Sequence, residues 1–133
     1  MREAEIRIRT GSDRVLDITE RVARFVFDAG DGLLNIFVPH ATAGVAIMET
    51  GSGSEPDLVD ALERLFPRDD RYRHSHGSRG HGADHILPAL VSPSVTIPVS
   101  AGRLQLGTWQ SIVLVDLNID NPERKIRLSL LEG

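Results

Sequence analysis

Residues 33–48 read LLNIFVPHATAGVAIM. Two apolar runs, 33–38 and 45–48, flank a polar turn that contains His40 and ends at Gly44. Short apolar runs bounded by turn-forming residues are typical of buried strands. The stretch therefore predicts two buried strands joined by a polar turn, with a histidine at the end of the first strand.

Strand-like patterns recur along the rest of the chain. Charged and apolar residues alternate from Glu3 to Arg9, which is the pattern of a half-buried strand. Further strands are expected at residues 15–18, 94–99, 103–106, 111–117 and 125–131. Strand content therefore exceeds helix content in the predicted fold.

Two amphipathic segments predict the main helices. Apolar residues at helical spacing favour a helix over about 20–29, with Thr19 as its N-cap and a glycine as its stop. A second helix is expected over 54–66, where a serine can cap and acidic residues follow. A short third helix is expected to start near Asp84, because Pro88 is tolerated only in a first helical turn.

The order of these elements indicates the fold class. A chain of 133 residues has the length of one domain and can bury a core without disulfides. Strands and helices segregate rather than alternate regularly, which favours an antiparallel sheet. We therefore expect a single α+β domain over residues 1–133, a largely antiparallel β-sandwich with two main helices.

Composition excludes several classes of protein and of site. The chain has no cysteine, so any metal must be held by nitrogen and oxygen ligands. Its net charge is -4 and its arginines are interleaved with acidic residues, which argues against nucleic-acid binding. No stretch approaches the roughly 18 apolar residues of a membrane span, and the first residues lack a secretory signal pattern. We expect a soluble cytoplasmic protein without nucleic-acid or membrane partners.

Four of the five histidines fall in the segment HSHGSRGHGADH, residues 74–85. Most of this segment belongs to a polar, glycine-rich stretch that predicts a long loop over 67–82, and long loops in compact domains are often functional. Neutral imidazole is the commonest protein ligand for first-row metals and titrates near neutrality. The cluster therefore indicates metal binding or proton transfer, with a solvated loop as the alternative reading.

Spacing alone leaves the ligand set open. His74 and His76 would face the same side of an extended segment, whereas His81 and His85 would share a face only on a helix. Three glycines disfavour a helix across residues 77–82. Asp84 is expected either to orient a metal-bound imidazole or to cap the helix that follows.

Other polar residues at predicted strand ends are weaker candidates. His40 matters only if the fold brings it to the cluster, and Glu49 is the carboxylate nearest to the second strand quoted above. Thr108 and Gln110 flank Trp109 and offer a hydroxyl and an amide to a substrate or a neighbouring subunit. The indole of Trp109 itself is expected to be buried in the core.

Five motifs occur in an order that resembles the YjbQ family, also called the UPF0047 proteins. They are PHATAG at 39–44, YRH at 72–74, ADHI at 83–86, SVTIPV at 94–99 and GRLQLGTWQ at 102–110. The resemblance covers essentially the whole chain. It implies a compact α+β sandwich that forms a homotrimer, with three histidines in a cleft near a subunit boundary. Matched by motif, these are His40, His74 and His85.

The chain departs from the family pattern in the turn at 120–124, where DNPER replaces a shorter Gly-Pro-Arg, and at two places earlier in the chain. Glu49 is present, but its usual amide neighbours are replaced by Met48 and Thr50. The Glu-Gly-Asn that commonly follows Tyr-x-His is replaced here by His76-Gly77-Ser78. The two earlier departures change the polar groups expected around the site.

The resemblance also implies an activity. Members of the family have been described as secondary thiamine-phosphate synthases, which join a pyrimidine diphosphate to a thiazole phosphate and release pyrophosphate. This implies a metal-dependent enzyme with a phosphorylated small-molecule substrate. Zinc is the expected divalent metal, with magnesium as the alternative for a diphosphate substrate. The competing hypotheses are a metal-assisted hydrolase and a non-catalytic trimeric protein that binds metal or a small ligand.

Roles follow for individual residues under the leading hypothesis. His40, His74 and His85 are the expected metal ligands, with coordination positions left open for water or substrate. Glu49 and His74 are the expected catalytic residues. Glu49 is expected either to act as a base or to accept a hydrogen bond from a metal-bound histidine. Contacts to substrate are expected from Thr42, Thr108, Gln110 and Arg124.

Overall fold

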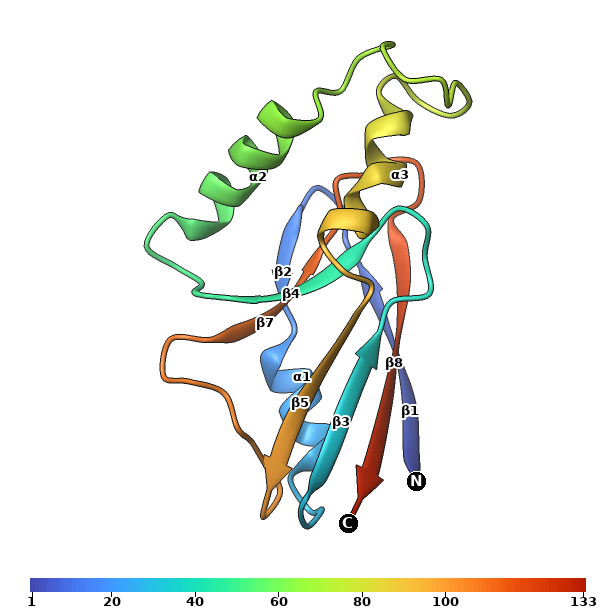
Figure 1. Ribbon diagram of the computed structural model, residues 1–133. Coiled ribbons are helices and arrows are strands. Elements are labelled where there is room, and N and C mark those ends of the chain that lie inside the picture. The colour runs from blue at the N-terminus through green and yellow to red at the C-terminus, as the bar shows by residue number, and fades with distance from the viewer.

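Strand β7 (Ser111–Val115) is buried on both faces in the computed structural model, which describes residues 1–133 (Figure 1). Ile112 and Leu114 belong to one apolar cluster, while Val113 and Val115 belong to another. Successive side chains of a strand point to opposite faces, so a continuous apolar run fits a strand covered on both sides. The domain accordingly has two cores, one on each face of β7.

The strands form two sheets in which every pair is antiparallel. The first sheet has the order β1 (Arg2–Arg9), β8 (Glu123–Glu132), β3 (Gly32–Phe37), β5 (Ser94–Ser100), β6 (Arg103–Leu104). The second has the order β2 (Val15–Asp17), β7, β4 (Gly44–Met48). The predicted α+β class and largely antiparallel sandwich are confirmed.

The two strands of the 33–48 stretch lie in different sheets. β3 pairs with β5 and β8, whereas β4 pairs with β7. The polar turn between them therefore carries the chain from one layer to the other rather than closing a hairpin. This places His40 and Thr42 where the two sheets meet.

Three helices complete the domain: α1 (Thr19–Val26), α2 (Ser54–Leu65) and α3 (His81–Leu90). α1 contributes Val22 and Val26 to the first core. α2 and α3 cover the second sheet and share the second core, to which Leu62 and Leu87 contribute. Figure 1 shows the segment 66–80 joining these two helices at one end of the molecule. None of the three helices is long and apolar enough to cross a membrane.

α1 differs from its prediction at both ends. Thr19 is the first helical residue and does not cap the helix. Its hydroxyl instead donates to Asp17 at 2.6 Å and accepts the N–H of Ile112 at 2.8 Å, which ties the helix to β7. The helix ends at Val26, earlier than expected.

α3 begins three residues before Asp84, and Pro88 lies in its second half. A proline inside a helix removes one backbone hydrogen bond. The helix ends at Leu90, so that loss is confined to its last turn. α3 is thereby longer than predicted and includes His81.

Trp109 is 74% exposed, and the expectation that it is buried is wrong. It lies on the turn between β6 and β7, where the Gln110 side chain accepts the N–H of Gly107 at 2.7 Å. This hydrogen bond closes the turn outside the apolar cores. Both cores are built mainly from aliphatic side chains instead.

Gly44, where the chain enters the second sheet, tests how tightly the backbone packs at the crossing between the two sheets. A Cβ at this position would collide with the carbonyl oxygen of Val91, whereas a Cβ at Gly30 would meet nothing within 4 Å. We expect G44A to lower the free energy of unfolding by about 1–3 kcal/mol, as overpacking does. G30A should change it by less than about 0.5 kcal/mol. Urea unfolding measures both, and equal midpoints for the two variants would contradict this account.

Candidate functional site

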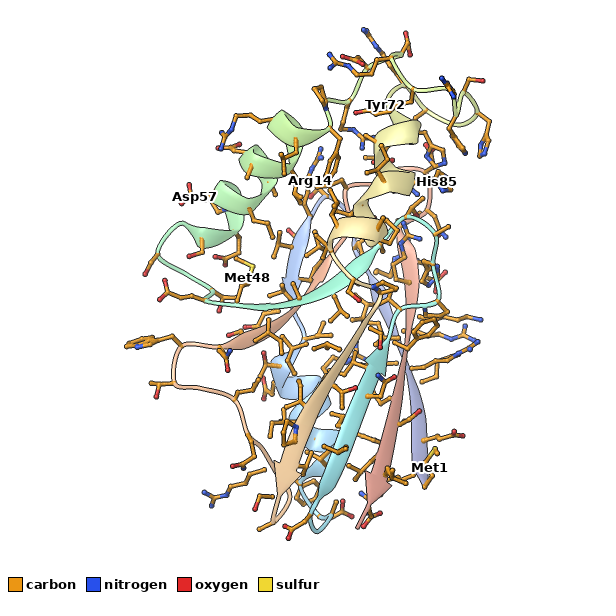
Figure 2. The ribbon with its side chains drawn as sticks, viewed as in Figure 1. Met1, Arg14, Met48, Asp57, Tyr72 and His85 are labelled. Carbon is orange, nitrogen blue, oxygen red and sulfur yellow. The ribbon has the colours of Figure 1, made fainter.

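The four histidines of segment 74–85 converge where that segment meets α3. Ring centroids lie 4.2 Å apart for His74 and His85 and 4.7 Å apart for His81 and His85. His76 stacks against His74 at 4.0 Å. One ring nitrogen from each of the four residues lies within 4.8 Å of all the others. We call these four residues the histidine cluster; Figure 2 labels His85 within it.

His81 joins the cluster because α3 starts at this residue. Gly80 immediately before it has φ 79°, a left-handed conformation that lets the chain turn into the helix. His81 and His85 then lie one helical turn apart on the same face, with their Nε2 atoms 3.0 Å apart. As expected from the glycines, no helix runs across 77–82, but α3 starts early enough to include His81.

Two polar anchors hold the loop against the rest of the domain. Arg68 forms a bidentate ion pair with the fully buried Asp84. Asp120, after β7, accepts the N–H and the hydroxyl of Ser78 at 3.0 and 3.1 Å. The Ser78 N–H, and then its hydroxyl, lowers the pKa of the Asp120 carboxyl, and the charge of Arg68 lowers it further. Asp120 therefore stays ionised beside the cluster.

Asp84 makes no capping hydrogen bond, so its predicted capping role is not realised. Its Oδ2 lies 3.5 Å from Nδ1 of His81, and Oδ2 of Asp120 lies 3.2 Å from the same nitrogen. These are ion-pair contacts without hydrogen-bond geometry, since Nδ1 of His81 has no hydrogen-bond partner. The two carboxylates flank His81 rather than His85.

The cluster has the properties of a metal site. Nδ1 of His74 is buried without a hydrogen-bond partner, which is costly for a polar atom. Partial burial, together with the neighbouring imidazoles, lowers the pKa of His74 and of His85. Both rings are therefore neutral at neutral pH, which is the form that binds metals. Four nitrogen donors suit zinc or another late first-row metal and do not suit magnesium, which prefers oxygen.

A groove of about 570 Å³ opens beside the cluster. His76, His81 and His85 line it from the loop and α3. Residues from the 39–42 turn and from the chain between β7 and β8 line it as well, namely His40, Thr42, Asn118, Asp120, Asn121 and Arg124. The groove therefore brings together four predicted site residues from three distant parts of the sequence: His40, Thr42, His85 and Arg124.

Arg124 is 2% exposed and is held in a buried polar network. Its Nε and Nη2 donate to the Asp116 carboxylate at 2.6 and 3.0 Å, and Nη2 also donates to the Thr42 hydroxyl at 2.8 Å. Asn118 donates to the same hydroxyl at 3.3 Å. Nη1 of Arg124 and the hydroxyl proton of Thr42 are left without a protein partner. The network therefore offers two donors to an anion in the groove.

His40 lies beside this network. Its Nε2 accepts the backbone N–H of Lys125 at 2.9 Å. Burial, and then the charge of Arg124, lowers its pKa. A neutral imidazole that accepts through Nε2 carries its proton on Nδ1. His40 therefore presents a third donor, its Nδ1–H, rather than a free lone pair.

Three predicted site residues lie elsewhere in the chain. Glu49 follows β4 at the end opposite Gly44, next to Met48, which Figure 2 labels below α2. A strand of this length spans roughly 16 Å, so Glu49 does not reach the groove of its own chain. Thr108 and Gln110 lie on the exposed turn between β6 and β7 and do not line the groove either.

Sequence reasoning missed Asp116, Asn118 and Asp120. They alternate with apolar residues directly after the buried run of β7, so they continue on one face of an extended chain. Polar residues at the end of a buried strand are the signal that could have identified them. Arg68 had no comparable signal, because its partner Asp84 is distant in sequence.

The sequence matches known proteins over nearly its full length. The family model described as UPF0047 protein YjbQ-like matches residues 4–133. A UPF0047 protein of Mycobacterium tuberculosis is 68% identical over 124 residues, covering 93% of each chain. The UPF0047 protein YugU of Bacillus subtilis is 34% identical over 115 residues, covering 82% of this chain and 83% of YugU.

Solved structures share the fold. A hypothetical protein from Aeropyrum pernix superimposes with a TM-score of 0.88 at 31% identity and covers 100% of both chains. A YbjQ-like protein of unknown function from Sulfolobus solfataricus gives a TM-score of 0.90 at 25% identity, covering 99% of this chain and 97% of that chain. The descriptions of these proteins assign no activity.

The buried ion pair gives a stability prediction. Asp116→Ala leaves the Arg124 charge buried without its carboxylate, which should lower the free energy of unfolding by about 3–5 kcal/mol. Glu20→Ala is the control, because Glu20 faces Arg24 at 3.9 Å on the exposed surface of α1 and should contribute less than about 0.5 kcal/mol. Chemical denaturation measures the difference. Similar losses in the two variants would refute the role given to Asp116.

Proposed function

Because the chain belongs to the UPF0047 protein YjbQ-like family, we propose that it is a divalent-metal-dependent enzyme that acts on a phosphorylated small molecule. One observation carries this proposal: the histidine cluster and the spare donors of Thr42 and Arg124 open into the same groove. Metal ligands beside anion-binding donors are the arrangement that phosphate chemistry uses.

Zinc is the proposed metal, on the basis of the nitrogen donors of the cluster. His74 and His85 are brought together by the structure, and His40, the third ligand implied by the family, lines the same groove. A divalent ion held there would supply positive charge for the oxygens of a phosphate or diphosphate.

The most specific form of the proposal is the thiamine-phosphate condensation. In that reaction the thiazole nitrogen bonds to the pyrimidine's side-chain carbon, and the diphosphate departs with the electrons of the broken carbon–oxygen bond. The Arg124 guanidinium, the Thr42 hydroxyl and Nδ1–H of His40 would donate hydrogen bonds to the charge that develops on the leaving group. His74, in the cluster beside the groove, would serve at the reacting atoms.

Glu49, Thr108 and Gln110 fit this proposal only through a neighbouring subunit. They lie away from the groove of their own chain, and the turn that carries Thr108 and Gln110 also exposes the large apolar side chain of Trp109. A homotrimer, as the family resemblance implies, would let these residues approach the groove of an adjacent copy. In that assembly Glu49 would be the base, and Thr108 and Gln110 would contact substrate.

Metal content and turnover test the proposal together. Protein purified without chelators should contain about one equivalent of zinc per chain, and less than about a tenth, with no gain on added zinc, would reject the metal. Incubation with a pyrimidine diphosphate and a thiazole phosphate should release pyrophosphate. Orthophosphate release from the diphosphate alone would favour the hydrolase instead. A substrate-induced thermal shift without turnover would favour a binding protein.

His85→Ala should reduce turnover at least about 100-fold, since loss of a ligand exceeds the loss of its outer hydrogen-bond partner. Arg24→Ala, on the exposed face of α1, is the control and should retain the full rate. Both variants should show the same thermal midpoint once metal is removed. An unchanged rate in His85→Ala would exclude its proposed role.

A further inference from the structure

We propose that His81, rather than His40, is the third protein ligand of the metal, and that the exposed His76 is a fourth ligand that substrate displaces. This inference rests on the proposed function in one respect, that a divalent metal binds the histidine cluster. It assigns the resident site to His74, His81 and His85. It leaves His40 on the wall of the groove as a donor to the substrate.

The geometry of His81 is that of a ligand held in place. Its ring is 8% exposed and lies between the carboxylates of Asp84 and Asp120, both of which are nearest to Nδ1. Its Nε2 points at Nε2 of His85, 3.0 Å away. A carboxylate behind the far nitrogen is the usual arrangement around a metal-bound histidine. Nitrogens about 3.4 Å apart are also what tetrahedral zinc requires, given Zn–N distances near 2.1 Å.

The surrounding loop is shaped to admit the His81 ring. Gly77 has φ 82°, and a Cβ there would lie 2.8 Å from the His81 ring and 2.9 Å from the Asp120 carboxylate. The loop therefore passes directly over the ring. The loop on one side and the helix on the other thus leave His81 buried beside the groove.

His40 lacks the free lone pair that a ligand needs. Its Nε2 is occupied by the N–H of Lys125, and its Nδ1 then carries the proton. To bind a metal through Nε2, His40 would have to give up this hydrogen bond. To bind through Nδ1, it would have to lose its remaining ring proton. His40 also lies outside the group of four whose nitrogens lie within 4.8 Å of one another.

His76 differs from the other three members in exposure. It is exposed, whereas His81 is buried and His74 and His85 are half-buried. It also lines the groove beside Thr42 and Arg124. A solvent-facing side chain on a glycine-flanked loop loses little packing when it moves aside. Its departure would open the coordination position that a catalytic site requires.

Cobalt(II) titration of the metal-free protein tests the assignment, because cobalt reports both affinity and coordination geometry. His81→Ala should weaken cobalt binding at least about 100-fold, more than loss of an outer partner does. His40→Ala should change the cobalt affinity less than about threefold, because His40 is not a ligand in this assignment. His81→Asn, which keeps a polar side chain at the start of α3, should weaken binding similarly and guards against misfolding of the alanine variant.

The outcomes separate this inference from the proposed function. Strong binding lost in His40→Ala but kept in His81→Ala would overturn the inference and leave the metal-dependent enzyme standing. No cobalt or zinc binding by the unmodified chain would reject the metal itself. His76→Ala should keep the cobalt affinity within about tenfold, since an exposed ligand contributes less. Inorganic phosphate should alter the visible spectrum of the cobalt-loaded, unmodified chain. An unaltered spectrum at saturating phosphate would refute the displaceable role.

Asp120 is the positioning residue in this arrangement. Asp120→Asn keeps an oxygen for the Ser78 N–H but removes the charge behind His81. Cobalt affinity should fall about 10–100-fold, as it does when outer partners of metal-bound histidines are lost. Asp70→Asn, which removes the same charge from an exposed site facing Arg79 at 3.8 Å, should leave the affinity unchanged. Equal affinities in the two variants would contradict the role of Asp120.

Discussion

The ion pair between Arg124 and Asp116 joins the parts of the molecule that make the groove. Asp116 follows β7 of the second sheet, Arg124 lies in β8 of the first, and both sit with Thr42 of the turn that links the sheets. Burying two charges costs free energy that apolar side chains of similar volume would not cost. Compared with an apolar pair, the ion pair therefore contributes position rather than extra stability, although removing one partner alone leaves a costly unpaired charge. The pair fixes a guanidinium edge and a hydroxyl at the point where the two layers meet.

The same groove receives neutral imidazoles from its other elements. Burial lowers the pKa of His40 and His85, which line the groove, and of His74 in the adjoining cluster, so the groove presents lone pairs and N–H groups instead of positive charge. Arg124 is compensated by Asp116, and Asp120 remains ionised near His81. A site of this kind has little net charge of its own. Its affinity for phosphate groups would come from a bound cation and from aimed donors rather than from a field of basic residues.

Periodicity predicted the strands well because each one is buried on a definite face. The alternation in β1 and the continuous run in β7 follow directly from one-sided and two-sided burial. It could not predict that β3 and β4 belong to different sheets, since both read as buried runs. The start of α3 was missed because it depends on one left-handed glycine, Gly80, and on an ion pair between residues distant in sequence. The burial of Trp109 was predicted wrongly because the hydrophobicity of a side chain does not show whether the turn that carries it lies outside the core.

Choosing between His40 and His81 as a ligand depends on hydrogen-bond direction, which no sequence spacing encodes. Both residues line the groove, and both are histidines near carboxylates. His40 receives a backbone N–H on one nitrogen and so must keep its proton on the other. His81 has carboxylates behind one nitrogen and a second imidazole in front of the other. The first arrangement suits a hydrogen-bond donor and the second suits a metal ligand, so under the proposed function residues of one type would divide the work of holding the metal and binding the substrate.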